Sequence, residues 1–329
     1  MYGVWQTPIT ITFVANLSGV SDPSSQKIAP NTSITMPTLT GSQYFMGWAT
    51  SQGATTATYN AGQSVTTFAS DTTLYGVWTT ESGIMYSAGS VAGATDIPAT
   101  QSGSGSMTIS AQIPKYIPAD ASMTVATAAS FNYWTKAGDS TKYYPGDTIT
   151  VSGGIVTLTA NWTTGCHAIR TVADFQTMGN TSVNSKKYVL AASLSLSGVT
   201  NNIGGPSTGG TGQIFEGVFN GNGYTLSNLN YSDSNNYVGL FGVTIAGVQI
   251  KYLNIDSFTI RNTGFYSTRW AGVLVGRANG GEFTHVVITN STATGNYPQD
   301  DATTPIRIFT GQQESATYIN CYANGTKVT

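Results

Sequence analysis

The chain has 329 residues, enough for two or three domains, and its 6 Trp, 18 Tyr and 12 Phe supply the apolar surface for packed cores. Only 9% of the residues are charged and the formal net charge is −2. The basic stripe required for binding nucleic acid or acidic lipid is therefore missing. No apolar run approaches the roughly 20 residues that cross a bilayer, which argues against membrane insertion of this segment.

A short strand-like segment occurs three times. It reads MYGVW at residues 1–5, LYGVW at residues 74–78 and LTANW at residues 158–162. The two later copies each close a longer module, so we interpret residues 1–7 as the closing strand of a preceding repeat. On this interpretation the chain is a piece of a longer array, and we expect a secretion signal and a surface anchor outside it.

Residues 8–81 and 82–164 are predicted to be two copies of one small β module. The first begins with the period-two pattern ITITFV at residues 9–14. Both then place aromatic residues in the same order, and a module of this size must bury them to be stable. We predict core positions for Trp48, Tyr59, Trp78, Trp134, Tyr143 and Trp162. A stack of such rings could also hold a sugar.

These residues resemble the Listeria–Bacteroides repeat, the repeat type of the internalin B-repeat region. The first copy carries FMGW at residues 45–48, then Tyr59-x-x-Gly62, then the closing LYGVW. The second copy has Tyr133 in place of the glycine before its tryptophan. The resemblance implies small β-grasp-like modules that serve bacterial surface proteins as stalk or interaction units, without catalytic residues.

Residues 165–329 follow a different pattern. A capping box at Thr171 and Asp174 predicts a short helix, and residues 188–196 read as an apolar strand. Gly242, Gly276 and Gly311 then recur at intervals of 34 and 35 residues. A second element keeps step with them as residues 250–255, 283–288 and 318–323, with residues 226–231 as a shorter antecedent. This rhythm predicts a solenoid of stacked parallel coils, with Leu240, Leu274 and Cys321 inside.

The solenoid segment resembles the GLUG-repeat region of bacterial surface proteins. FEGVFNGNGYTL at residues 215–226 and the core GLFG at residues 239–242 carry the resemblance, although Asn220 stands where the family usually has aspartate. The resemblance implies a right-handed parallel β-helix behind a capping helix. The expected fold class is thus all-β, with two β-grasp-like modules followed by this solenoid.

Candidate catalytic groups are scattered. The one acidic pair of this half, Asp300 and Asp301, lies in a polar loop, and Glu282 has no companion in other coils. His167 and His285 are isolated, and Cys166 and Cys321 are 155 residues apart, so we expect two free, buried thiols. Polysaccharide-cleaving solenoids need clustered carboxylates. We therefore predict no enzyme activity, no metal and no cofactor.

The predicted function is that of an extracellular, adhesin-like segment of a bacterial surface protein that binds a host protein or a glycan. Aromatic residues at loops and coil corners are the candidate ligand surface: Tyr231, Tyr237, Tyr266, Trp270 and Tyr297. Each of them could instead pack over the neighbouring coil. Two alternatives stay open. One is self-assembly through the solenoid ends or the N-terminal strand, and the other is a polysaccharide-active enzyme.

Overall fold

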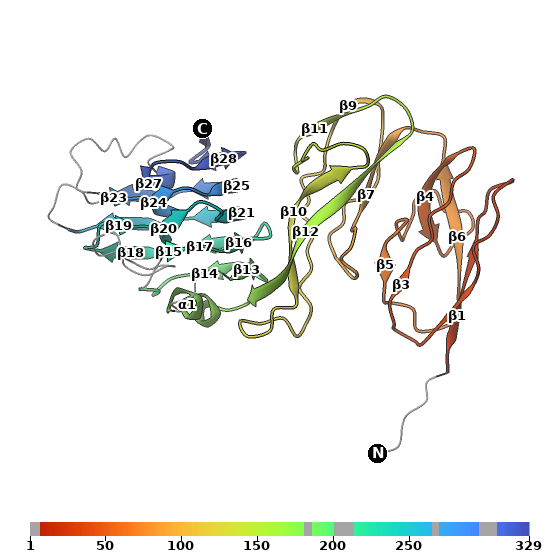
Figure 1. Cartoon of the computed structure of the whole chain (residues 1–329), viewed down its shortest axis with the longest axis horizontal. Helices are drawn as coiled ribbons and strands as arrows, with labels where there is room; N and C mark the ends of the chain where they lie inside the picture. The colour runs from red at the N-terminus through yellow and green to blue at the C-terminus, as the bar shows by residue number, and fades with distance from the viewer. Residues whose placement is uncertain (1–6, 181–185, 201–213, 265–269, 296–307, 329) are drawn as a thin grey trace, which may run out of the picture. The chain divides into compact units, whose positions relative to one another are not determined.

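The protein is nearly all β, as predicted. The structure, a computed structural model, describes residues 7–180, 186–200, 214–264, 270–295 and 308–328. The only helix among the elements described is α1, Val172–Asn180, and the C-terminal part is a β-solenoid of about three turns (Figure 1). The expected closing strand at residues 1–7 lies, apart from its last residue, outside the described residues.

The chain forms two compact units. The N-terminal unit comprises residues 1–116 and 131–162, and the C-terminal unit comprises residues 117–130 and 163–329. The two predicted modules therefore share one unit, and residues 117–130 leave the second module to join the solenoid. The Arg170 side chain holds this segment, since Nε donates to the carbonyl of Ala121 (3.2 Å) and Nη2 to that of Pro118 (2.8 Å).

The first module is a four-stranded mixed sheet with a small ribbon beside it. Its sheet has the order β2-β1-β6-β4, in which β1 and β6 are parallel and the outer strands are antiparallel to their neighbours. β3 and β5 form the antiparallel ribbon. The strands are β1 (Ile9–Val14), β2 (Gln26–Ile28), β3 (Ile34–Thr35), β4 (Tyr44–Ala49), β5 (Ser64–Val65) and β6 (Thr72–Thr79).

The second module repeats this connectivity strand for strand. β7 and β12 are the parallel pair, β8 and β10 flank them, and β9 and β11 form the ribbon. Its strands are β7 (Gly83–Ser87), β8 (Gln101–Ser102), β9 (Gly105–Thr108), β10 (Ala128–Lys136), β11 (Thr148–Val151) and β12 (Ile155–Ile169). Residues 7–164 contain no helix. The β-grasp likeness of the modules stays a prediction.

A cluster of four aromatic rings fills each module. Trp48 is fully buried and lies edge-on to Phe13 and Phe45, with ring centroids 4.9 and 5.3 Å apart, and Phe45 in turn packs 4.9 Å from Trp78. In the second module Tyr86, Phe131, Trp134 and Trp162 repeat the arrangement at 4.9, 5.0 and 5.9 Å. The other four predicted core aromatics are only half-buried, namely Tyr59, Trp78, Tyr143 and Trp162. Tyr59 and Tyr143 each form an isolated β-bridge with the central tryptophan of its module.

The indole N–H groups distinguish the two copies. The closing tryptophans behave alike, because Trp78 Nε1 donates to the carbonyl of Ala15 (2.6 Å) and Trp162 Nε1 to that of Ala88 (2.7 Å). The central tryptophans differ. Trp48 Nε1 donates to the Pro37 carbonyl (2.7 Å), whereas Trp134 Nε1 is buried without a partner among the described residues.

The glycine of the FMGW segment is required by a close backbone approach. Gly47 has φ +132°, and a Cβ there would lie 2.3 Å from the carbonyl oxygen of Tyr59. Tyr133 replaces it in the second module, where its ring packs against Tyr144 (6.3 Å) and lies under the Lys142 ammonium (5.1 Å). The two copies therefore differ in backbone conformation at this equivalent position.

Acid should weaken the second module through Asp139. Hydrogen bonds from the Thr141 side chain, the Tyr143 hydroxyl and the Thr141 backbone hold the pKa of Asp139 at about 2, below its ordinary 3.8. Because the pKa of Asp139 is lower in the folded than in the unfolded chain, its ionised carboxylate stabilises the fold at pH values above the unfolded-state pKa. This stabilisation is lost as the pH falls through about 2. We expect the urea midpoint of Asp139→Asn to change less than that of the unaltered chain between about pH 4 and 2. An equal pH dependence of the urea midpoint in the variant and in the unaltered chain would contradict this.

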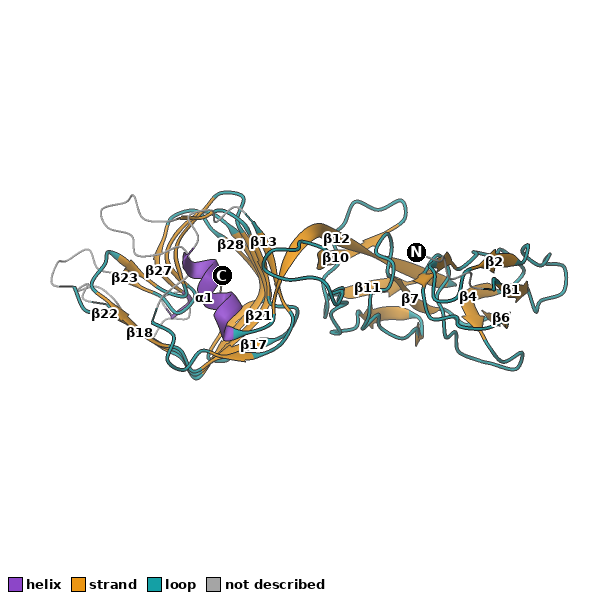
Figure 2. Ribbon diagram, turned by 90° about the horizontal axis from the view of Figure 1, so that it is seen from below, coloured by secondary structure: helices purple, strands orange, loops and turns teal. Residues whose placement is uncertain are grey.

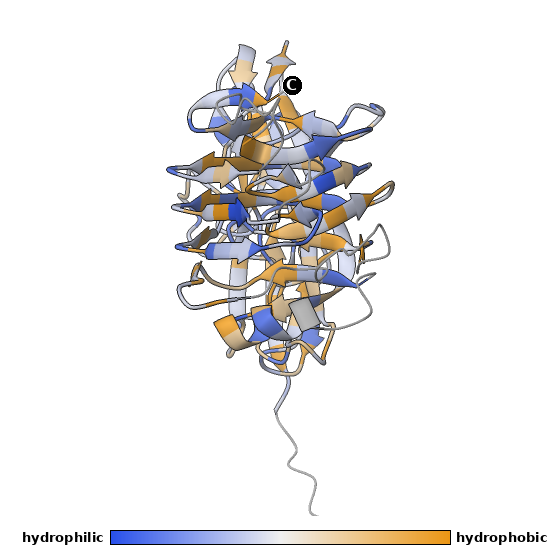
Figure 3. Ribbon diagram, turned by 90° about the vertical axis from the view of Figure 1, so that its left-hand side faces the viewer, coloured by the Kyte–Doolittle hydropathy of each residue, from blue (hydrophilic) through white to orange (hydrophobic). Residues whose placement is uncertain are grey.

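The solenoid is built from parallel ladders of stacked strands (Figures 1 and 3). One ladder runs β13-β16-β21-β25 and ends on β28 and β29, a second runs β15-β20-β24-β27, and a third runs β18-β22-β26. The strands are β13 (Lys187–Leu190), β14 (Leu194–Ser195), β15 (Ile214–Phe215), β16 (Val218–Asn220), β17 (Thr225–Ser227), β18 (Asn230–Asp233), β19 (Tyr237–Val238), β20 (Phe241–Ile245), β21 (Gln249–Asp256), β22 (Thr259–Asn262), β23 (Trp270–Ala271), β24 (Val275–Asn279), β25 (Glu282–Thr289), β26 (Thr292–Thr294), β27 (Thr310–Gln313), β28 (Thr317–Ile319), β29 (Cys321–Ala323) and β30 (Thr326–Val328).

The predicted repeat of the second element has the register expected for stacked coils. Ile250 pairs with Phe283, and Phe283 pairs with Tyr318. The proposed antecedent was wrong, because Ile250 pairs with Phe219, and Leu226 pairs with Ile255 instead. The predicted strand at residues 188–196 is also divided into β13 and β14, with a bend between them.

Glycine sets the distance between coils. A Cβ on Gly276 would lie 2.5 Å from the Val238 nitrogen and 2.6 Å from the Tyr237 carbonyl carbon in the neighbouring coil. Gly311 stands one coil further on, where its Cβ would lie 2.8 Å from the backbone of Ala271. Gly276 and Gly311 are therefore positions at which one coil's backbone touches the next.

One corner of each coil turns on a residue in the left-handed region. These residues are Asn228, Ser257, Asn290 and Asn324, with φ of 61°, 57°, 50° and 46°. Asparagine tolerates this conformation better than most residues. Its amide also binds the adjoining coil, because Asn290 Nδ2 donates to Asp256 Oδ1 (2.8 Å). The corner thus fixes both the turn and the stacking.

Helix α1 lies across one end of the coil stack (Figure 2). The predicted capping box is present, since the Asp174 N–H donates to Thr171 Oγ1 (3.1 Å) and the Thr171 N–H to Asp174 Oδ2 (3.0 Å). Phe175 and Met178 point into the solenoid core and are fully buried. The helix therefore covers apolar side chains of the first coils.

Candidate functional site

Of the five predicted ligand residues, the structure buries one and pairs two others, and the remaining two lie outside the described residues. Tyr231 is only 4% exposed, because strand alternation turns it into the solenoid core. Its hydroxyl donates to Asp233 Oδ2 (2.7 Å), and burial, reinforced by this carboxylate, raises the pKa of Tyr231. Placing it on a ligand surface was wrong. Tyr266 and Tyr297 lie outside the described residues.

Tyr237 and Trp270 form an aromatic pair on neighbouring coils. They are register partners in β19 and β23, and the next residues, Val238 and Ala271, are buried. Alternation therefore directs both rings to the outer face, where both are half-buried. We call this pair the aromatic row.

A charged pair borders the aromatic row. The Arg277 guanidinium lies 5.2 Å from the centre of the Tyr237 ring, and its Nη1 donates to the Tyr237 hydroxyl (3.3 Å). Its Nε also donates to Glu314 Oε1 (2.9 Å) in the next coil. An aromatic surface beside fixed donors and acceptors can bind a polar ligand that has apolar faces, such as a sugar.

The surroundings of the two thiols and the two imidazoles indicate that these groups have structural roles. Cys166 and Cys321 are free and buried, as predicted, and burial raises the pKa of each thiol to about 11. His167 packs 5.9 Å from Tyr188, and desolvation lowers its pKa. His285 packs 5.4 Å from Tyr252. Among the described residues, no group of three or more His, Cys, Asp or Glu could hold a metal ion.

Of the remaining acidic candidates, Glu282 lies in the part of the chain that is described. Glu282 is half-buried at the start of β25, and Asp300 and Asp301 lie outside the described residues. Asn220 is fully buried, and its Nδ2 donates to Ser130 Oγ (2.7 Å). Sequence reasoning missed this contact because the two residues are 90 positions apart.

The fold and the aromatic row define an all-β protein of the solenoid class. No helix in the described segments is long and apolar enough to cross a membrane. The chain is similar to Halomucin of Haloquadratum walsbyi, with 36% identity over 134 residues. The match covers 39% of this chain and 1% of that protein's length. No family model and no solved structure matches. The match and the solenoid are compatible with a surface protein.

Proposed function

We propose that this chain is a non-enzymatic, extracellular segment of an adhesin-like surface protein, in which the solenoid binds a glycan or a host protein. The observation that carries the proposal is the aromatic row of Tyr237 and Trp270, set on neighbouring coils beside the Arg277–Glu314 ion pair. The low charge, the tandem modules and the similarity to Halomucin support a surface setting.

Binding by the aromatic row is tested with Trp270→Ala. The full chain is applied to an array of neutral and acidic glycans and to immobilised host extracellular proteins. We expect the variant to weaken the strongest interaction by about tenfold or more, because aromatic anchors dominate such contacts. Tyr322→Ala is the matched control, since Tyr322 is an aromatic residue of the same unit, 38% exposed on β29. Equal loss in both variants, or binding to nothing on either support, would contradict the proposal.

The absence of enzyme activity is tested separately. The chain is incubated with a panel of neutral and acidic polysaccharides, and released reducing ends and unsaturated products are measured. We expect neither to rise above a heat-denatured control. Product formation would replace the adhesive proposal with a polysaccharide-active solenoid.

A further inference from the structure

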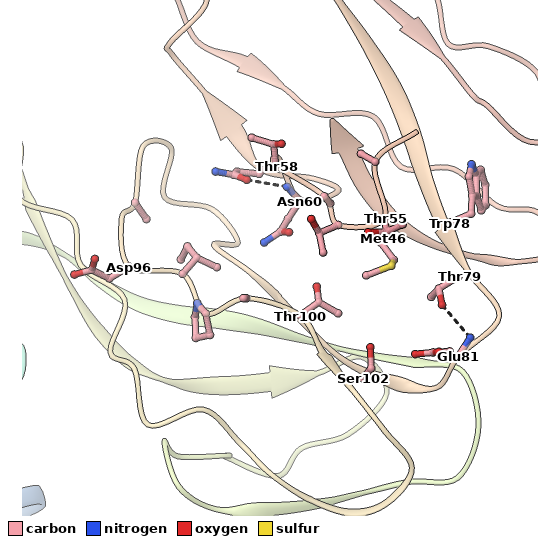
Figure 4. A pocket seen from close by; sticks show the side chains of 18 residues that line it. Met46, Thr55, Thr58, Asn60, Trp78, Thr79, Glu81, Asp96, Thr100 and Ser102 are labelled. Carbon is pink, nitrogen blue, oxygen red and sulfur yellow. Dashed lines mark hydrogen bonds between the residues drawn. The ribbon is translucent and has the colours of Figure 1, made fainter. Parts of the chain in front are cut away.

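The N-terminal unit contains a hollow of about 730 Å³ (Figure 4). The loop after β4 and the end of β6 line it from the first module, and residues 94–102 line it from the second. Its volume falls in the range of small-molecule sites, roughly 300–1,000 Å³. The hollow lies away from the aromatic row in sequence and belongs to the other compact unit.

Eight of the 18 residues that line the hollow are polar and uncharged. Hydroxyl groups come from both modules, with Thr55 and Thr79 on one side and Thr100 and Ser102 on the other (Figure 4). Apolar contact is available as well, because Met46 and Trp78 line the same hollow. Sugars need this combination, since they carry many hydroxyl groups together with apolar C–H faces.

The charges in the hollow are negative. Glu81 and Asp96 are its only ionisable side chains, and it has no Lys, Arg or His in its lining. Asp96 is already neutralised, because its Oδ2 lies 3.1 Å from Lys115 Nζ. Glu81 therefore leaves a negative charge in the lining. A phosphate, a sulfate or an acidic sugar would meet repulsion there.

Two lining residues are held in place by bonds to the rest of the unit. Asn60 Nδ2 donates to the carbonyl of Tyr86 (2.5 Å), which ties the first module to the second. Trp78 is fixed by its bond to the Ala15 carbonyl and by its packing against Phe45. A fixed lining reduces the entropy cost of binding a small ligand.

We propose that this hollow is a binding site for a neutral saccharide. Hydroxyl and amide groups of the lining bond the sugar's hydroxyls, and Met46 and Trp78 contact its C–H face. The proposal does not depend on the aromatic row, because no residue is common to the two sites.

The test uses the full chain and a set of named sugars: glucose, galactose, mannose, N-acetylglucosamine, their short oligomers, and N-acetylneuraminic acid. Saturation-transfer NMR identifies binders, and calorimetry measures affinity. Thr100→Trp fills the hollow and should weaken binding of a neutral sugar by about tenfold or more. Thr67→Trp is the matched control, since Thr67 is exposed in the same unit and does not line the hollow.

The expected pattern is binding of at least one neutral sugar, weaker binding of N-acetylneuraminic acid, and loss in Thr100→Trp alone. Trp270→Ala should leave this binding unchanged, which separates the hollow from the proposed solenoid site. The inference is overturned if no neutral sugar binds at millimolar concentration, if the acidic sugar binds equally well, or if Thr100→Trp and Thr67→Trp behave alike.

Discussion

Replacing Gly276 with alanine should destabilise the solenoid by about 3 kcal/mol, near the upper end of the usual cost of overpacking. The added Cβ would lie 2.5 Å from the Val238 nitrogen and 2.6 Å from the Tyr237 carbonyl carbon. These are backbone atoms of the neighbouring coil and cannot rotate away. The coils must separate locally, which strains the bonds between them. Urea denaturation, monitored by hydrogen exchange of amides in the C-terminal unit, measures the change in the free energy of unfolding.

Gly153→Ala supplies the control for the added methyl group. A Cβ at Gly153 meets no atom within 4 Å, and its φ lies outside the left-handed region. We expect a change within about 0.5 kcal/mol, as for most surface substitutions. A Gly276→Ala variant as stable as Gly153→Ala would show that the coils are not held at this distance by backbone contact.

The two central tryptophans should respond differently to the same substitution. Alanine at Trp48 or Trp134 should cost about 3–5 kcal/mol, because each side chain is fully buried among other rings. Phenylalanine distinguishes them. At Trp48 it also removes the donor of the Pro37 carbonyl, whereas at Trp134 it removes an N–H without a partner in the described structure.

We therefore expect Trp48→Phe to cost about 1 kcal/mol more than Trp134→Phe, the usual net contribution of one hydrogen bond to stability, because the bond to the Pro37 carbonyl is only partly buried. Both variants lose the same volume, so the difference reports the hydrogen bond. Equilibrium urea unfolding of the full chain, followed by the fluorescence of the remaining tryptophans, gives both values. Equal costs, or a larger cost at Trp134, would contradict the assignment.

The sequence predicted where the repeated elements lie better than it predicted which residues they contact. Pairs of tryptophans 30 and 28 residues apart indicated the two modules, and recurring glycines indicated the coils. Strand alternation shows that a side chain faces inward, but it cannot say which ring it meets. The packing of Phe13 on Trp48, repeated by Tyr86 on Trp134, was missed for this reason.

Contacts between distant segments were also beyond reach. Nothing in residues 117–130 indicates that Arg170, about 50 positions later, binds their carbonyls and attaches them to the solenoid. Tyr231 was placed at a loop or coil corner, whereas it lies within strand β18, Asn230–Asp233. Tyr231 in fact pairs with the inward-facing Ile260. Whether the aromatic row binds a ligand depends on affinity, which a pattern of residues does not measure.

The bonds from Trp78 to Ala15 and from Trp162 to Ala88 bear on how such a chain can change its length. In both modules the last strand fastens itself to the end of the first, so a module satisfies its own closing bond without help from the next. A duplication or deletion of one whole module leaves every such bond intact. The number of tandem copies could then be altered in single-module steps without breaking these closing bonds.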